Sequence, residues 1–290
     1  MKDIPTSPRI ALIKRNRQVK RLRLIILSII LFISVIFGLS YFSSYFRITI
    51  NNLVITGDKI IDGSKIELSV KEKLSGKYLK LFSRSNFLIY PKNKIYKSLL
   101  VEFPRIEKLV VKRERFNNLK IEINERAGSY LYCGSSLPVN KEEIGENCYF
   151  VNNDGYIFDK APYFSGDIYF KYYTKIDGDT SNPLGSQMIP VSRFHDLVRF
   201  VDGLTSLGFK PLYLVIDTNG TYSLYLKSKD LQIVPKIIFK DNNDLVMILD
   251  NLSTSMKNKE FANEINTKYD TLLYIDLRFK NKVLYKFGDL

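Results

Sequence analysis

The sequence of 290 residues contains a single histidine, two cysteines and none of the short motifs that mark common catalytic sites. The absent motifs include Gly-x-Ser-x-Gly, Ser-x-x-Lys, His-Glu-x-x-His and the glycine-rich phosphate loop. His195 lies on the polar side of a predicted helix, and no second histidine exists to complete a zinc site, so we expect an exposed helix residue. Asp154, in Asn-Asp-Gly, predicts a turn rather than a calcium loop. The sequence therefore predicts no catalytic residue, no metal site, no cofactor and no enzymatic activity.

Charge is absent from residues 24–46, LIILSIILFISVIFGLSYFSSYF. At about 1.5 Å per residue, a helix of this segment is roughly 34 Å long, which exceeds a hydrocarbon core of about 30 Å. The alternative is a cleaved signal peptide, for which Gly38-Leu39-Ser40 offers small residues at a cleavage site. The apolar run is longer than the usual signal peptide core. We therefore expect an uncleaved transmembrane helix over residues 24–46.

Positive charge is concentrated just before this apolar segment. Residues 1–23 hold eight Lys or Arg and one acidic residue, Asp3, which is half of the formal charge of +14. Basic residues beside a first span resist translocation, so this segment is predicted to be cytoplasmic and the chain from Arg47 onward to be outside the cytoplasm. This topology accounts for the basic cluster without a nucleic-acid partner. We expect a single-pass protein of the cytoplasmic (inner) membrane.

The two cysteines, Cys133 and Cys148, flank the polar segment GSSLPVNKEEIGEN. Strand-like residues lie outside both, which would place the thiols across the ends of a hairpin. In an oxidising compartment a disulfide there would stabilise the fold by about 3 kcal/mol. Two free buried thiols fit the sequence equally well, because a sequence does not contain the geometry that a bridge requires.

Residues 47–126 carry patterns typical of an α+β domain. A strand is predicted over 47–56, and a capping box of Ser64 and Glu67 opens a first helix. A second helix begins at Pro91 and stops before Pro104, which cannot continue a helix. Two strands with one apolar face follow, over 105–116 and 119–127. The predicted order is strand, helix, helix, strand, strand, in a unit with one sheet face for the helices to cover.

Residues 127–290 predict a mixed β-sheet domain with packed helices. Glycines at 155 and 220 mark hairpin turns. Two amphipathic helices are expected over 191–208 and 245–256, the second capped by Asp241. The remaining predicted strands are 211–217, 221–227, 231–239, 271–279 and 282–287. In the strand YIDLRF, alternation places Asp276 and Arg278 together on one side, which we interpret as solvated.

Five segments resemble the FtsQ/DivIB family of bacterial cell-division proteins, in which a POTRA domain follows a single span and precedes a β domain. The resemblance spans the whole chain, with no counterpart for residues 162–187, and it implies domains over 1–23, 24–46, 47–126 and 127–290. The segments are Val54-Ile55-Thr56-Gly57, Pro104–Val111, Ile121–Arg126, the hairpin Phe150–Lys160 and the closing Tyr274–Arg278.

The resemblance implies a non-enzymatic scaffold of the division machinery (divisome) at the septum. Its partners would be small single-pass coiled-coil proteins of the FtsB/DivIC and FtsL type, other division membrane proteins and membrane lipid, with no small-molecule substrate. By motif position the partner-binding residues fall on Phe279, Asn281 and Phe287, although ordinary edge-strand packing is an alternative for these residues. Two other classes are a polypeptide-transport protein and a cell-wall enzyme. The first needs a barrel that the remaining residues cannot form, and the second needs a catalytic constellation that the sequence does not show.

Overall fold

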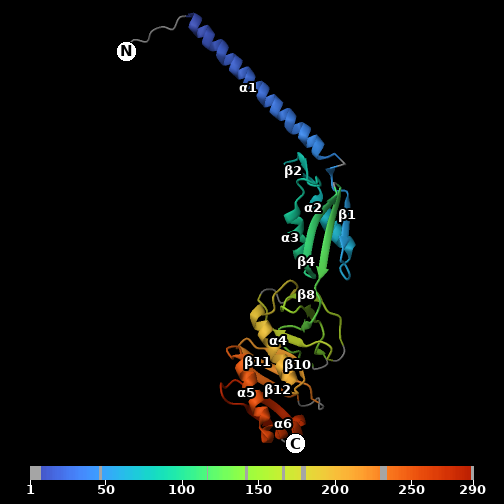
Figure 1. The fold of residues 1–290 in the computed structure, drawn as a ribbon, viewed down its shortest axis with the longest axis vertical. Coiled ribbons are helices and arrows are strands. Elements are labelled where there is room, and N and C mark those ends of the chain that lie inside the picture. Colours follow the sequence, from blue (N-terminus) through green and yellow to red (C-terminus); the bar gives the residue numbers. More distant parts are fainter. Residues whose placement is uncertain are drawn as a thin grey trace, which may run out of the picture. The chain divides into compact units, whose positions relative to one another are not determined.

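The computed structural model is α+β, as the sequence predicts: its described residues form six α-helices and mixed sheets (Figure 1). The chain divides into two compact units, Met1–Glu125 and Arg126–Leu290. Parts of several sequence predictions lie outside the described residues: the start of the basic segment, the end of the apolar segment, the first residue of the strand predicted over 47–56, the last residue of the strand predicted over 105–116, residues 141–142 between the cysteines, and the start of the strand predicted over 231–239. The structure describes residues 8–45, 48–115, 117–140, 143–164, 167–177, 181–228 and 234–288.

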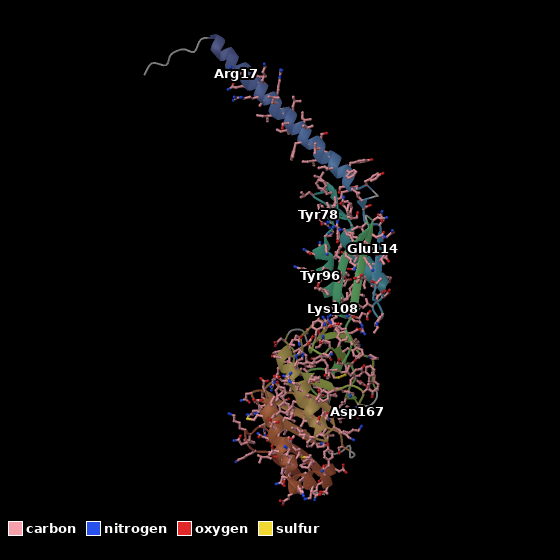
Figure 2. The ribbon with its side chains drawn as sticks, in the orientation of Figure 1. Arg17, Tyr78, Tyr96, Lys108, Glu114 and Asp167 are labelled. Carbon is pink, nitrogen blue, oxygen red and sulfur yellow. A yellow bond between two sulfur atoms is a disulfide. The ribbon has the colours of Figure 1, made fainter. Side chains whose placement is uncertain are left out.

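Helix α1 (Pro8–Ser43) contains residues 24–43 of the long apolar segment. Within its part Arg17–Ser43, an 18-residue window has a mean hydropathy of 2.7 and is 0% buried inside the structure. From Arg17 onward, the side chains of this helix point outward (Figure 2). By length and composition, α1 can cross a membrane once.

The rest of the first unit is a three-stranded sheet covered by two helices. The strand order is β1 (Asn52–Thr56), β5 (Asn118–Glu125), β4 (Ile106–Arg115), with β1 parallel and β4 antiparallel to β5. Helices α2 (Gly63–Leu74) and α3 (Lys92–Glu102) bury one apolar stripe each against this sheet. A small hairpin of β2 (Lys77–Tyr78) and β3 (Phe82–Ser83), which the sequence did not predict, joins the two helices.

The cap of α2 differs from the prediction. Asp62, rather than Ser64, is the N-cap, and its Oδ1 accepts a hydrogen bond of 2.9 Å from the backbone N–H of Ser64. The Ser64 hydroxyl donates to the same oxygen, and Glu67 pairs with Lys71 instead of closing a capping box. Asp62 and Ser64 are both favourable N-cap residues and lie two positions apart. Asp62 is the cap because its carboxylate is the stronger acceptor for the first helical N–H groups.

Glu125 fastens the end of β5 to the loop that leads into α2. Its Oε1 accepts from three successive backbone N–H groups, of Lys59, Ile60 and Ile61, at 2.7, 2.9 and 3.0 Å. Its Oε2 lies 3.1 Å from Nε of Arg105. Burial would raise the pKa of this carboxyl, but these four donors outweigh burial and leave the pKa below its ordinary value.

The second unit contains a nine-stranded mixed sheet. Strand β9, which the sequence did not predict, lies in its interior and is parallel to both neighbours, β6 and β10. In sheet order the strands are β14 (Leu284–Phe287), β13 (Leu272–Asp276), β12 (Lys236–Lys240), β11 (Thr221–Leu226), β10 (Pro211–Ile216), β9 (Lys171–Thr174), β6 (Tyr130–Tyr132), β7 (Tyr149–Val151) and β8 (Ile157–Lys160).

Three helices cover one face of this sheet: α4 (Val191–Ser206), α5 (Leu245–Lys257) and α6 (Lys259–Thr267). The cap of α5 is Asp244, whose Oδ1 accepts from the N–H groups of Val246 and Met247. The predicted cap, Asp241, instead accepts a hydrogen bond of 2.6 Å from the hydroxyl of Tyr222. Both aspartates precede the apolar stripe, and only Asp244 is adjacent to its first residue. Helix α6 was not predicted.

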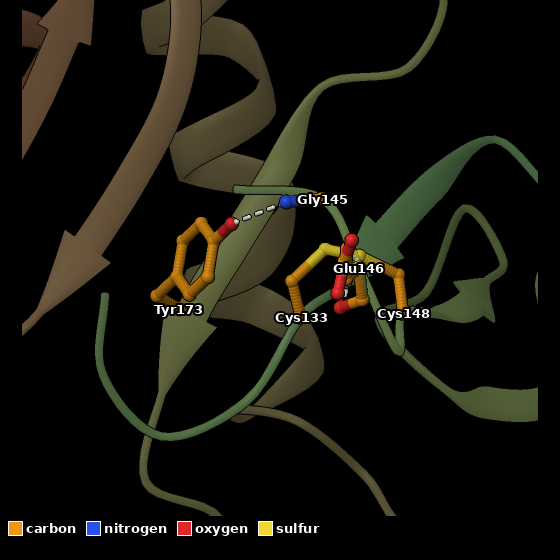
Figure 3. Close-up of a disulfide and its surroundings, with 5 residues drawn as sticks. All are labelled: Cys133, Gly145, Glu146, Cys148 and Tyr173. Atoms are coloured by element: carbon orange, nitrogen blue, oxygen red, sulfur yellow. Dashed lines mark hydrogen bonds between the residues drawn. A yellow bond between two sulfur atoms is a disulfide. The ribbon is translucent and has the colours of Figure 1, made fainter. Parts of the chain in front are cut away.

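A disulfide closes the loop that covers part of the other face. Cys133 and Cys148 are bonded, with their Cα atoms 4.2 Å apart, so of the two alternatives that the sequence left open the structure has the bridge (Figure 3). Leu137 and Ile144 of the loop pack on a sheet-face cluster that includes Tyr173. The backbone N–H of Gly145 donates to the Tyr173 hydroxyl at 3.1 Å, which pins the loop to β9 (Figure 3).

Candidate docking edge

Strand β14 is the outermost strand of the nine-stranded sheet and pairs only with β13 in the part of the chain that the structure describes. Leu284 and Tyr285 in this strand are 44% and 37% exposed. An outermost strand presents backbone N–H and C=O groups on its unpaired side, and an extended peptide can pair with these groups. The geometry of β14 therefore permits strand addition.

The structure brings two of the three sequence-predicted site residues together. Phe279 and Asn281 lie in the turn between β13 and β14, and both are exposed, Phe279 by 50%. The turn is held to α5 by the side-chain amide of Asn251, which donates to the carbonyl oxygen of Lys280 at 2.9 Å. Phe279 is therefore displayed from an anchored turn, just beyond the end of β13.

Phe287, the third predicted residue, lies at the opposite end of β14. It is opposite Leu272 in the register, and its half-buried ring packs against the main core. The ammonium of Lys268 lies 5.5 Å from the ring centroid, a cation–π distance. The position of Phe287 fits a residue that holds the edge strand on the domain.

Tyr285 occupies the middle of the edge, and sequence reasoning missed it. Its hydroxyl donates to Oε2 of Glu264 at 2.8 Å, and its ring lies edge-on against Phe261 with centroids 5.1 Å apart. The hydrogen bond from Tyr285, followed by that from Lys268, lowers the pKa of the Glu264 carboxyl, and the same bond raises the pKa of Tyr285. Alternation in VLYKF could have placed Tyr285 toward the helices, but its partners come from the unpredicted α6.

The predicted solvated position of Asp276 is wrong. Asp276 is only 4% exposed, because the guanidinium of Arg278 folds back over its carboxylate. Burial would raise the pKa of this carboxyl, but the hydrogen bonds from the side chain and backbone of Arg278 outweigh burial and leave the pKa below its ordinary value. The pair closes the end of β13, with the Asp276 carboxylate bonded to both the guanidinium and the backbone N–H of Arg278.

His195 and Asp154 meet in the structure, with His195 Nε2 3.0 Å from Asp154 Oδ1. Both side chains are substantially exposed, at 44% and 57%. Throughout the described ranges, no group of three His, Cys, Asp or Glu side chains could hold a metal ion. This contact is a surface pair between a helix and a turn.

No protein-family model matches this sequence, and no curated protein matches it either.

Proposed function

We propose that this protein is a membrane-anchored, non-enzymatic scaffold of the FtsQ/DivIB type, with its N-terminus in the cytoplasm and both folded units outside it. Three features support the proposal. Helix α1 is long and apolar enough to cross a membrane, and the basic residues precede its apolar part. Apart from the β2–β3 hairpin between its helices, the first unit has the strand-helix-helix-strand-strand order expected of a POTRA domain. On the resemblance of the sequence to that family, the proposal includes a location in the inner membrane at the division septum.

The observation that carries the docking function is the position of β14 at the outer edge of the nine-stranded sheet. In this proposal an extended segment of a small single-pass coiled-coil division protein, of the FtsB/DivIC or FtsL type, adds a strand beside β14. Main-chain pairing supplies affinity, and the exposed side chains of Phe279, Asn281 and Leu284 select the partner. Phe287 contributes indirectly, since its packing against the core holds β14 in place.

The test is partner recovery by a Phe279→Glu variant of the full chain. A charge in place of an exposed aromatic at the docking edge should weaken partner binding by about tenfold or more, which corresponds to about 1.4 kcal/mol. The matched control is Val246→Glu on α5, where the replaced side chain is 66% exposed and outside the edge. Full partner retention by Phe279→Glu, with the fold intact by circular dichroism, would contradict the docking site.

Depletion of the protein tests the cellular role. Undivided filaments, together with a midcell band of a fluorescent fusion, are the expected result. Normal division after depletion would refute the division assignment, whatever the binding result at Phe279.

A further inference from the structure

The β2–β3 hairpin of the first unit lies against the last turn of α1. The hydroxyl of Ser40 donates to the carbonyl oxygen of Leu81 at 2.6 Å, and the backbone N–H of Ser83 donates to the hydroxyl of Ser43 at 3.2 Å. The side-chain amide of Asn86 adds a bond of 3.0 Å to the Ser43 carbonyl oxygen. These bonds fix the hairpin at the level of residues 40–43 of the helix.

That level coincides with the boundary of a bilayer crossed by α1. The charge-free run begins at Leu24, and about 20 helical residues cross the hydrocarbon core. The crossing from Leu24 therefore ends near Ser43, in the turn that carries the hairpin. The position of the hairpin at the bilayer boundary rests on the membrane span that the proposed function includes.

The tip of the hairpin is apolar and strained. Leu79 is 87% exposed, and Leu79 and Lys80 have φ of +49° and +61°, in the left-handed region that suits glycine or asparagine. Such a conformation is unfavourable for each non-glycine residue. A Leu-Lys pair at this turn is unfavourable for the fold itself, and it gives the tip one apolar and one basic side chain.

All the charged residues of the surrounding segment are basic. Residues 73–101 contain seven Lys or Arg and no Asp or Glu. Arg113 from β4 adds a further positive charge beside this segment. Its Nη1 donates to the carbonyl oxygen of Phe87 at 2.9 Å. Basic side chains near a membrane surface are attracted by anionic lipid headgroups. An exposed apolar tip within a basic segment has the chemistry of an interfacial membrane contact.

We propose that the β2–β3 hairpin is a second membrane contact, in which Leu79 enters the headgroup region of the bilayer that α1 spans and the neighbouring lysines bind anionic phospholipid. The contact sets the tilt and rotation of the first unit on the membrane surface. It is separate from the docking edge, which belongs to the other unit.

The absence of tryptophan from the sequence gives a direct experiment. Full-length variants with one tryptophan each are placed in phosphatidylglycerol vesicles that contain lipids with a quencher at the headgroup or deep in the acyl chains. The test variant is Leu79→Trp, and Lys80→Trp is a second reporter at the tip. Phe32→Trp in α1 reports the span itself. Val101→Trp is the control, since Val101 is 82% exposed in the last turn of α3.

The expected result is headgroup quenching and a blue-shifted emission at Leu79→Trp and Lys80→Trp, acyl-chain quenching at Phe32→Trp, and neither effect at Val101→Trp. Quenching at the tip should weaken in phosphatidylcholine vesicles, and equal quenching there would overturn the part assigned to the lysines. If the tryptophans at positions 79 and 80 are exposed to water while that of Phe32→Trp is quenched, the hairpin contact is overturned and the membrane span is supported. A blue shift without lipid quenching would mean that protein covers the tip, and would also overturn it. Loss of quenching at Phe32→Trp would overturn the span and the inference together.

Discussion

The guanidinium of Arg278 closes over the carboxylate of Asp276, with Nη2 2.6 Å from Oδ2 and Nε 2.9 Å from Oδ1. The backbone N–H of Arg278 also donates to Oδ1, at 3.0 Å. One carboxylate therefore organises the chain where β13 ends and the exposed turn with Phe279 begins. The pair has a structural role at the docking edge.

An Asp276→Asn substitution should destabilise the second unit by about 1–2 kcal/mol, because the amide loses the charge-assisted bonds to Arg278. The pKa of Asp276 is lowered in the folded state, so its contribution is present above the unfolded pKa of about 3.9 and is lost as the pH falls through the folded pKa. Urea unfolding at neutral and acidic pH checks this prediction. The difference between wild type and variant should shrink in acid; a difference that is constant with pH would contradict it.

Glu125→Ala should loosen the loop before α2, because three backbone N–H groups lose one shared acceptor. The free energy of unfolding of the first unit should fall by about 2–3 kcal/mol. Hydrogen exchange measures the loosening directly at the backbone amides of Lys59, Ile60 and Ile61, which should lose protection. The matched control is Glu67→Ala, which removes an exposed pair with Lys71 and should change stability by less than about 0.5 kcal/mol. Unchanged protection in Glu125→Ala would refute the role assigned to this carboxylate.

Two adjacent tyrosines in β9 should respond oppositely to loss of the hydroxyl. The Tyr172 hydroxyl is buried and has no hydrogen-bond partner among the described residues, so Tyr172→Phe should raise the free energy of unfolding by about 1 kcal/mol. The Tyr173 hydroxyl accepts from Gly145, so Tyr173→Phe should lower it by a similar amount, about 1 kcal/mol. Thermal unfolding of both variants gives the comparison. A lower Tm for Tyr172→Phe would show that its hydroxyl is satisfied.

Removing the disulfide with Cys133→Ser and Cys148→Ser together should cost about 3 kcal/mol, the value expected for a closed loop of this length. Unfolding of the wild type in the presence of a reductant should give the same loss, which controls for the serine side chains. Equal Tm values for the oxidised wild type and the double variant would contradict the prediction.

Regular elements with a full apolar stripe could be predicted from the sequence. The helix predicted over 191–208 is observed over Val191–Ser206 and buries Phe194, Leu197 and Leu204. The two predicted hairpin glycines have positive φ, +80° at Gly155 and +75° at Gly220. In these segments the local pattern and the tertiary contacts agree.

The missed elements lack such a pattern. All four residues of β9, Lys171–Thr174, are buried, so no alternation distinguishes the strand. Helix α6 has nine residues and one buried side chain, Ile265, too few for a period to be recognised. Asp276 was assigned to the right side of its strand, but alternation does not reveal that Arg278 would cover it. Phe279 and Asn281 could be proposed as site residues only from motif position, and Tyr285 depends on partners in α6 that no local pattern contains.

The interior position of β9 has a mechanical consequence. In the proposed function a partner pulls on β14 and loads a continuous sheet. The register between β9 and β6 is the shortest between neighbouring strands of that sheet, with Leu131–Lys171 and Tyr132–Tyr172 aligned. The disulfide-closed loop starts at the end of β6 and is fastened to β9 through Gly145. The loop therefore gives β9 a second attachment beside β6, through the Gly145–Tyr173 hydrogen bond, and the disulfide between the two ends of the loop holds that attachment in place when the proposed docking edge is loaded.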